Sequence, residues 1–239
     1  MSTSAAPTLF ESIPAIRRLS ALAALSPSAV ARLRAASAAP RTMRQRREFV
    51  TEGEPVHEAR IVLSGWACHT HVLRDGRRQV LDFLLPGDLL GVCAQSNPVA
   101  SASIFAVTEV VTCPAPLPRA DDGGLAESYA VSAATSEHYL LRQVTRLGRL
   151  NAYERMVDWL MEIHERLALA GLADGGQFSM PLTQELIADT LGLTSVHVNR
   201  TLQALRSDGL LTLRSGQVLL PDLCRLEGLI ENRPVRVTG

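Results

Sequence analysis

The 239-residue sequence contains no lysine, so its 24 Lys and Arg positions are all arginine. Any cationic contact with a phosphate group must therefore come from arginine or from a protonated histidine. The formal net charge is zero, and bulk attraction to nucleic acid is consequently absent. A nucleic-acid-binding surface on this chain has to be a local patch.

Long hydrophobic runs and clustered cysteines are missing as well. No apolar stretch reaches the roughly 20 residues that a membrane span needs, and residues 1–8 lack the basic and apolar regions of a secretory signal. We therefore expect a cytoplasmic protein without a membrane partner. The four cysteines have no C-x-x-C pair, which favours isolated, small hydrophobic side chains: Cys68, Cys93, Cys113 and Cys224.

The first half of the chain has a helical pattern followed by a strand pattern. Residues 9–38 have a helical pattern, and Ser26 before a proline is a helix-start signal. Residues 42–113 consist of short apolar runs separated by glycines, which is typical of successive strands in an all-β roll or barrel. Asp75-Gly76 lies between two such runs and predicts a tight hairpin.

A break rich in Pro, Asp and Gly at residues 114–124 is followed by one long predicted helix at 125–150. Its apolar positions approximate a 3.5-residue seam, made by Ala133, Leu140, Val144 and Leu147. A narrow apolar stripe on a long helix favours a dimer interface formed with a second copy. The alternative is an internal core helix.

A second helix is expected after Asn151, which can cap it, and it ends near residues 170–171. Its apolar positions share one face: Tyr153, Met156, Val157, Leu160, Ile163 and Leu167.

Residues 183–208 predict two short helices joined by a tight turn. Thr183 and Thr194 are suited to cap the two helices, and Gly192 ends the first of them. This arrangement is typical of a helix-turn-helix, whose second helix enters the DNA major groove by its N-terminal end. A strand, turn and strand at 209–220 would add a wing with Arg214 at its tip. The alternative is an ordinary helix pair in an unrelated bundle.

The outward side chains of the second helix suit DNA. Arginine pairs with guanine, asparagine with adenine, and valine covers a thymine methyl, which makes candidate base-reading residues of Ser195, Val196, Asn199 and Arg200. Hydroxyl and cationic groups nearby are placed for backbone phosphates: Thr183, Thr194, His197, Arg206 and Arg214.

The order of β-roll, long helix and winged helix-turn-helix resembles the Crp/Fnr family of transcription regulators. Residues 182–200 carry the most specific part of the resemblance, and the glycine framework of the roll adds to it: residues 52–54, 63–66, 75–79 and 86–91. The resemblance implies an α+β fold with a double-stranded, cyclic-nucleotide-binding-like β-roll at 1–118, a dimerisation helix at 119–150 and a DNA-binding domain at 151–239. It also implies a homodimer, a palindromic DNA site and contact with RNA polymerase.

Two departures from the family pattern affect function. Many members have Glu where Val196 stands, so the preferred bases should differ, whereas Arg200 matches the family's recognition arginine. Cyclic-nucleotide binders hold the phosphate with an arginine, but the matching stretch at 92–101 contains none, and no cation occurs between Arg78 and Arg119. We therefore predict no tight cyclic-AMP binding, and the effector remains unidentified.

Other sensor chemistries have weaker support. His69 and His71 share a strand face and could bind a metal with His57 or Asp75, or one of the histidines could ligate a haem; a cupin-like metalloenzyme is thus the competing function. The plainer interpretation is two exposed strand histidines. The scattered cysteines do not resemble an iron–sulfur site, and a redox role for Cys93 or Cys113 lacks an adjacent cation. We expect no cofactor, no metal and no catalytic residues.

Overall fold

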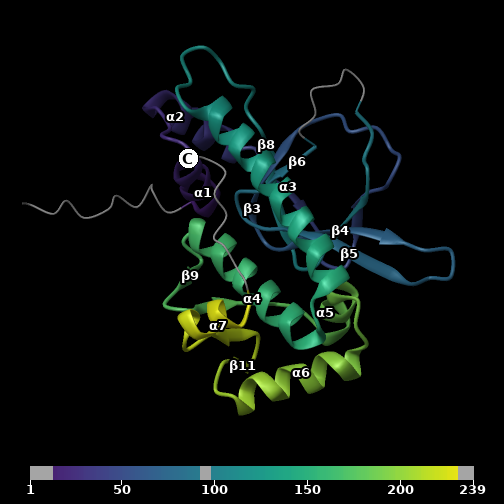
Figure 1. The fold of residues 1–239 in the computed structure, drawn as a ribbon. Coiled ribbons are helices and arrows are strands. Elements are labelled where there is room, and N and C mark those ends of the chain that lie inside the picture. Colours follow the sequence, from purple (N-terminus) through teal and green to yellow (C-terminus); the bar gives the residue numbers. More distant parts are fainter. Residues whose placement is uncertain (1–12, 92–97, 231–239) are drawn as a thin grey trace, which may run out of the picture.

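The computed structural model describes residues 13–91 and 98–230 (Figure 1). The predicted helical region at 9–38 is two helices, α1 (Pro14–Leu22) and α2 (Pro27–Ser37), and its first four residues lie outside the described part. The Ser26 side chain accepts a hydrogen bond from the Ala29 N–H at 3.2 Å, which confirms the helix-start signal.

Residues 41–91 and 98–114 form the predicted β-roll, built from two antiparallel four-stranded sheets. The first has the order β1-β8-β3-β6 and contains Arg41–Met43, Val110–Pro114, Arg60–Ser64 and Leu89–Leu90. The second has the order β2-β7-β4-β5 and contains Glu48–Val50, Ser103–Ala106, Ala67–Val72 and Arg78–Leu84. Both sheets contribute to one apolar cluster, which includes Val62 and Ile104. The core of the roll therefore lies between the sheets.

Strands β4 and β5 form a hairpin that projects from the roll (Figure 1). At its tip, Gly76 has φ of +86°, and the Leu73 N–H donates to the Arg77 carbonyl at 2.8 Å. This confirms the turn predicted from Asp75-Gly76, because glycine takes a positive φ without steric cost.

Two helices connect the roll to the C-terminal part: α3 (Leu125–Arg149) and α4 (Ala152–Leu169). Gly124, with φ of +80°, begins α3 where a Cβ would collide with the Ala24 carbonyl. Asn151 forms a complete capping box with Glu154, as expected for a helix start. Figure 1 shows α3 running alongside the roll toward the C-terminal part, and α4 returning beside it.

The C-terminal part contains the helix pair α5 (Gln184–Leu191) and α6 (Ser195–Ser207), followed by α7 (Leu223–Leu229). Beside them lies a four-stranded sheet of order β11-β12-β10-β9. The predicted wing hairpin is β11 (Thr212–Arg214) and β12 (Gln217–Leu219). Strands β9 (Ala173–Asp174) and β10 (Gln177–Ser179) were not predicted, because runs of two and three residues carry little periodicity.

A buried ionic network joins the roll to the long helices. The Arg166 guanidinium of α4 lies 2.7 Å from Asp82 and 2.9 Å from Asp88, both in the roll, and donates to the Phe83 carbonyl at 2.6 Å. Arg18 of α1 approaches Asp88 at 2.8 Å from another direction. Because buried charges are retained only when paired, this network ties the two parts together.

No helix among residues 13–91 and 98–230 is both long enough and apolar enough to cross a membrane.

Candidate nucleic-acid interface

Helices α5 and α6 form the predicted helix-turn-helix. The Thr183 hydroxyl accepts from the Leu186 N–H at 3.2 Å, and the Thr194 hydroxyl accepts from the His197 N–H at 3.2 Å. Gly192 ends α5 with φ of +62°, the left-handed conformation that favours glycine. Both predicted caps and the glycine turn are therefore confirmed.

One face of α6 is buried and the opposite face is open. Val198, Leu202 and Leu205 are at most 2% exposed and pack in the core. The four predicted base-reading residues are all exposed and form a stripe at the N-terminal end of the helix: Ser195, Val196, Asn199 and Arg200. Val196 is 60% exposed, so this apolar side chain lies where a thymine methyl could cover it.

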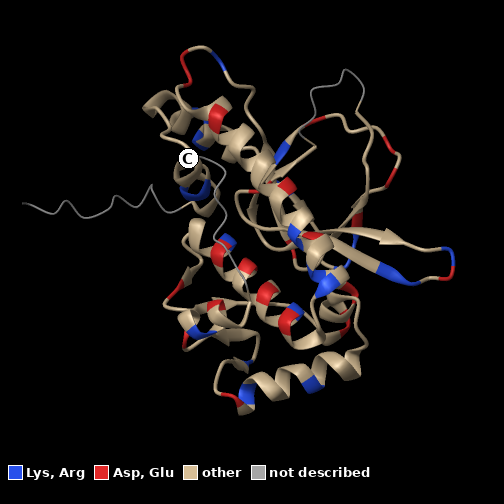
Figure 2. Ribbon diagram, in the orientation of Figure 1, with Lys and Arg blue, Asp and Glu red and all other residues tan. Residues whose placement is uncertain are grey.

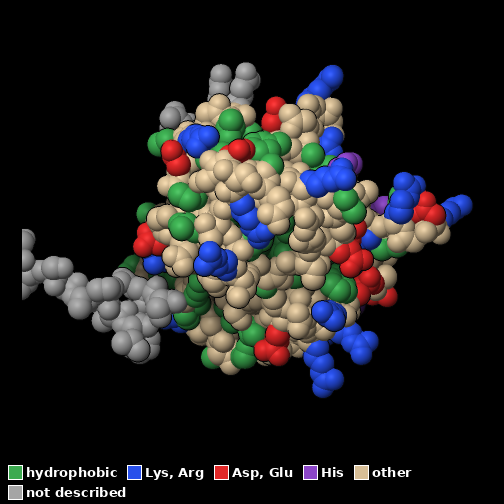
Figure 3. All heavy atoms as spheres, turned by 90° about the horizontal axis from the view of Figure 1, so that it is seen from below, with side chains coloured by type: hydrophobic (Ala, Val, Ile, Leu, Met, Phe, Trp, Pro, Cys, Tyr) green, Lys and Arg blue, Asp and Glu red, His purple; other side chains and the backbone are tan. Residues whose placement is uncertain are grey.

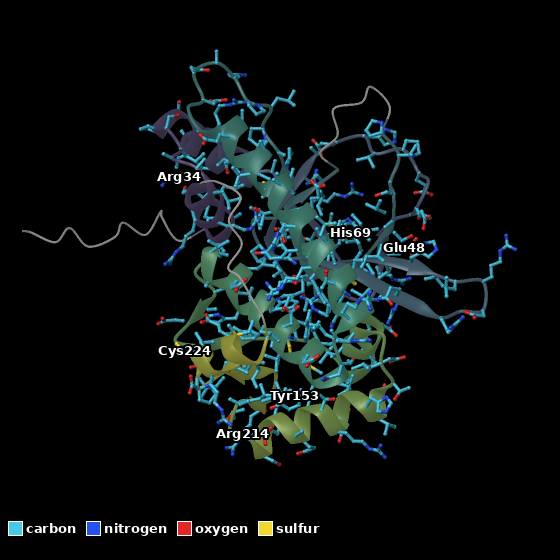
Figure 4. The ribbon with its side chains drawn as sticks, in the orientation of Figure 1. Arg34, Glu48, His69, Tyr153, Arg214 and Cys224 are labelled. Carbon is cyan, nitrogen blue, oxygen red and sulfur yellow. The ribbon has the colours of Figure 1, made fainter. Side chains whose placement is uncertain are left out.

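Of the predicted phosphate-contacting residues, Thr194 and His197 lie beside this stripe, whereas Arg206 lies near the C-terminal end of α6. Thr183 and Thr194 use one lone pair as helix caps and keep their O–H groups for donation. His197 is exposed, and Arg214 is exposed at the end of β11, at the α6 end of the molecule (Figure 4). Arg206 donates to the Leu213 carbonyl at 3.2 Å, so it also links α6 to the wing.

The wing itself turns at Ser215 and Gly216, with φ of +49° and +76°. Its two strands pair in register from Thr212↔Leu219 to Arg214↔Gln217. The hairpin thus holds Arg214 beside the recognition helix rather than on a free loop.

The charge on this side of the molecule is local. Helix α6 contains Arg200 and Arg206 and no acidic residue (Figure 2). Figure 3 views the molecule from below, the side on which α6 lies in Figure 1, and shows separate basic side chains rather than one continuous band. The sequence, with zero net charge, predicted only a local basic surface, and on this side the basic side chains are separate.

Two side-chain contacts of the helix-turn-helix were not predicted from the sequence. Gln184, the first residue of α5, is exposed, and its Oε1 lies 3.4 Å from the Asn199 amide nitrogen. Tyr153, in the first turn of α4 (Figure 4), donates from its hydroxyl to Asp208 at 2.7 Å, at the C-terminal end of α6. Burial raises the pKa of Tyr153 to about 12, with the Asp208 hydrogen bond adding to the shift. The position of Gln184 directly after a helix cap was the available signal, and the sequence placed Tyr153 only on the apolar face of the second helix.

Helix α3 has an inverted pattern of exposure. The face turned toward the rest of the chain is largely polar, with Ser132, Thr135, Gln143 and Arg146 buried. The opposite face exposes Leu140 by 45%, Leu141 by 62% and Val144 by 70%. Of the predicted seam, Ala133, Leu140 and Val144 are exposed and Leu147 is half-buried beside the helix-turn-helix. Leu140 and Val144 are therefore not packed in the core of the single chain, and the alternative of an internal core helix is wrong for this part of the seam.

A cavity of about 890 Å³ opens in the roll. Its apolar lining comes from residues such as Met43, Phe49 and Ile104, and its polar lining includes Arg41, His57, Arg60 and His69. In a cyclic-nucleotide binder the arginine was expected only within residues 92–101, after the glycine framework, whereas Arg41 and Arg60 come from β1 and β3. Arg60 already donates to Thr112 at 2.8 Å and pairs with Glu58.

The two candidate metal-binding histidines lie in different surroundings. His69 is half-buried in the cavity wall, and burial lowers its pKa. His71 is exposed, and its Nδ1 lies 2.9 Å from Glu52 Oε2. Within the described residues, no group of three or more metal-ligating side chains is assembled.

The cysteines have no shared site in the described part of the chain. Cys68 and Cys113 are buried, and burial raises the pKa of both thiols, that of Cys68 to about 12. Cys113 is thus a poor candidate for a reactive thiolate. Cys224 is exposed, while Cys93 lies outside the described residues.

A β-roll, a long connecting helix and a winged helix-turn-helix together define a two-domain DNA-binding regulator. A family model described as "Cyclic nucleotide-binding domain" matches residues 40–119, and one described as "Crp-like helix-turn-helix domain" matches residues 154–229. The chain belongs to the Crp/Fnr family of transcription regulators.

Named relatives cover most of the chain. The nitrogen fixation regulation protein FixK of Bradyrhizobium diazoefficiens is 32% identical over 176 residues, which are 70% of this chain and 72% of that protein. The transcriptional activator protein FnrL of Cereibacter sphaeroides is 29% identical over 191 residues, 74% of each chain. The structure of FixK2 from Bradyrhizobium japonicum aligns with a TM-score of 0.68 and 28% identity, over 80% of this chain and 96% of that one. FixK and FnrL both carry the names of regulatory proteins, in agreement with the family.

Proposed function

We propose that this protein is a cytoplasmic, sequence-specific transcription regulator that binds a palindromic promoter site as a homodimer and contacts RNA polymerase there. The observation that carries the proposal is the exposed stripe of Ser195, Val196, Asn199 and Arg200 at the N-terminal end of α6. In this proposal Arg200 pairs with a guanine and Asn199 with an adenine. Surrounding residues hold the backbone phosphates: Thr183, Thr194, His197, Arg206 and Arg214.

The exposed apolar face of α3 supports the homodimer. Leu140, Leu141 and Val144 are large hydrophobic side chains with 45–70% of their surface open to solvent. Three such residues within five positions of one helix are costly for a monomer, because each gains from being removed from water. A second copy packed along α3 covers them and places two recognition helices in a symmetric pair.

We propose the same three functional segments that the sequence predicts. Residues 1–118 form the sensor-like roll, 119–150 the dimerisation segment and 151–239 the DNA-binding domain. The buried contacts of Arg166 with Asp82 and Asp88 bind these parts into one body rather than leaving two independent domains.

We also propose that cyclic AMP is not a tight effector. Among the described cavity-lining residues, Arg60 is already satisfied by Thr112 and Glu58, and Arg41 is exposed. A cyclic phosphate held there would compete with Glu58 for the Arg60 guanidinium. Calorimetric titration of the purified protein with cyclic AMP should give no heat of binding at micromolar concentration, and saturable binding would contradict this.

The main proposal is tested by selection of bound fragments from random duplex DNA. The experiment uses a stated, moderate salt concentration, because phosphate contacts alone hold any sequence at low salt. We expect enrichment of an inverted repeat whose half-sites lie about one helical turn apart. Enrichment of a single, unrepeated half-site would contradict the dimer, and enrichment of no sequence would contradict specific recognition.

A further inference from the structure

The last turn of α5 is the point where the other parts of the molecule meet the helix-turn-helix. Helices leave their final carbonyl groups without partners inside the helix. In α5 the carbonyls of Thr190 and Leu191 accept hydrogen bonds from side chains of three other elements, α3, α4 and β5. The first helix of the DNA-reading unit is therefore held at its C-terminal end.

Arg155 of α4 makes the most extensive of these contacts. Its guanidinium donates to the Leu191 carbonyl at 3.0 Å, to the Leu147 carbonyl at 2.9 Å and to the Leu150 carbonyl at 2.8 Å. Leu147 and Leu150 lie at the end of the dimerisation helix α3, so one cation joins the C-terminal ends of α3 and α5. A cation at a helix C-terminus is also favoured by the helix dipole.

The Thr190 carbonyl receives two further donors. Gln143 of α3, only 7% exposed, donates from Nε2 at 2.7 Å, and Gln79 of β5 donates at 3.2 Å. One carbonyl of α5 is thus shared by the dimerisation helix and the β-roll.

The neighbouring residue of β5 adds a charged contact. Arg78 donates two hydrogen bonds to Asp189 Oδ2, at 2.9 Å from Nε and 2.7 Å from Nη2. Both side chains are between one fifth and one third exposed, at 29% and 24%. Through this pair and Gln79, the strand that forms the roll's projecting hairpin is bonded directly to the DNA-binding unit.

These contacts act on geometry rather than on base recognition. None of Arg155, Gln143, Gln79 and Arg78 lies in the helix-turn-helix, so none belongs to the base-reading stripe. In a dimer packed along α3, the angle between α3 and α5 decides how far each α6 lies from the two-fold axis. Half-site separation on DNA mirrors that distance.

We infer that Arg155, with Gln143, and the Arg78–Asp189 pair, with Gln79, are positioning residues that fix the separation of the two recognition helices through the C-terminal turn of α5. This inference rests on the proposed dimeric DNA-binding function. Arg155 sets the angle from the dimerisation helix, and Arg78 transmits the position of the β-roll to the same turn. The half-site spacing that the protein prefers is therefore determined by residues that do not contact the DNA bases.

The test measures binding to a series of inverted repeats whose half-sites are identical and whose spacers differ by single base pairs. Wild type should show one preferred spacer. Arg155→Lys keeps the charge but cannot fork to three carbonyls, so the ratio between the best spacer and its neighbours should fall about fivefold or more, the usual size of a coupling between sites. Arg149→Gln, which changes an exposed arginine at the nearby C-terminal end of α3, is the matched control.

The β-roll contact is tested by reversal. Arg78→Asp should flatten the spacer preference, and adding Asp189→Arg should restore it, a rescue that simple loss of stability would not produce. Arg77→Gln, which changes the neighbouring exposed arginine, is the control. Binding to a single half-site and thermal unfolding verify that each variant is folded and reads DNA.

The outcomes separate the two proposals. Folded variants that keep the wild-type spacer ratio overturn the positioning inference and leave the proposed function intact. If wild-type protein recognises no inverted repeat at any spacing, the proposed function fails, and the inference fails with it. A charge-reversed pair that does not recover the spacer preference of Arg78→Asp overturns the β-roll arm.

Discussion

The Arg166 guanidinium lies 2.9 Å from Asp88 Oδ2, and both side chains are less than 5% exposed. Burial alone would raise the pKa of Asp88, but Arg18 and Arg166 hold it below its usual value. Asp88 ends the segment before β6, while Arg166 belongs to α4. The pair therefore connects the β-roll to the helix on which the DNA-binding domain is built.

Replacing Arg166 by methionine should destabilise the protein strongly. The change takes the Arg166 cation away from the Asp82 carboxylate and removes one of the two arginines beside the buried Asp88, while Glu162 keeps its pair with Arg146. Breaking a buried pair in this way costs about 3–5 kcal/mol, which urea unfolding measures. Arg77→Met, which breaks the exposed pair with Asp75, should cost no more than about 1 kcal/mol. Equal losses for the two variants would contradict this role.

Stability should fall on acidification, and His69 should contribute to the fall. Burial lowers the pKa of His69 in the folded state below its ordinary 6.5. The unfolded chain therefore binds a proton that the folded protein does not, so the stabilisation present above about pH 6.5 is lost as the pH falls through the folded pKa. We expect His69→Gln to show a shallower loss of unfolding free energy than wild type between about pH 7.5 and about pH 5.

The control for this measurement is His197→Gln, since His197 is exposed on α6. That variant should follow the wild-type curve. A His69→Gln curve parallel to wild type throughout the range would show that His69 is not desolvated in the folded protein.

Charges placed on the exposed face of α3 should separate the proposed dimer. In the double variant Leu140→Glu and Val144→Glu, each copy loses two apolar side chains that are worth roughly 1.5–3 kcal/mol each when fully buried. Sedimentation equilibrium should therefore report monomers at concentrations where wild type is dimeric. Leu117→Glu, on a residue 80% exposed outside α3, should leave the mass unchanged. A dimeric double variant would place the interface elsewhere.

Val196→Glu should change the bases that are read without abolishing binding. A carboxylate accepts a hydrogen bond from cytosine N4, which valine cannot do, and such a contact is worth about 1–3 kcal/mol of discrimination. Repeating the random-DNA selection with this variant should shift one position of each half-site toward a C·G pair. Ser207→Glu adds the same charge at the far end of α6 and should leave the selected sequence as in wild type. An unchanged consensus for Val196→Glu would remove Val196 from the base-reading set.

Local signals in the sequence were sufficient for much of the fold and for the recognition helix. Helix caps at Ser26, Asn151, Thr183 and Thr194 depend on residues within one turn, and each was predicted correctly. The same holds for the Asp75-Gly76 hairpin, because its turn conformation is a property of two residues.

Contacts between distant residues could not be predicted in this way. Arg166 and Asp82 are 84 positions apart, and nothing in either neighbourhood indicates the other. Arg60 enters the roll cavity from a strand that precedes the stretch in which a phosphate-binding cation was sought. The donors to the C-terminal turn of α5 come from three separate elements. Such relationships depend on how the elements pack, which a periodic pattern does not specify.

The most direct test of sequence-specific recognition by α6 compares Arg200→Ala with Gln203→Ala on the selected inverted repeat and on unrelated DNA, over a series of salt concentrations. Both residues are exposed on α6, but only Arg200 belongs to the proposed base-reading stripe. Arg200→Ala should lose about 1–3 kcal/mol per half-site on the repeat, with little change on unrelated DNA and in the salt slope. Gln203→Ala should bind as wild type does. Unchanged affinity of Arg200→Ala for the repeat would contradict base recognition by this helix.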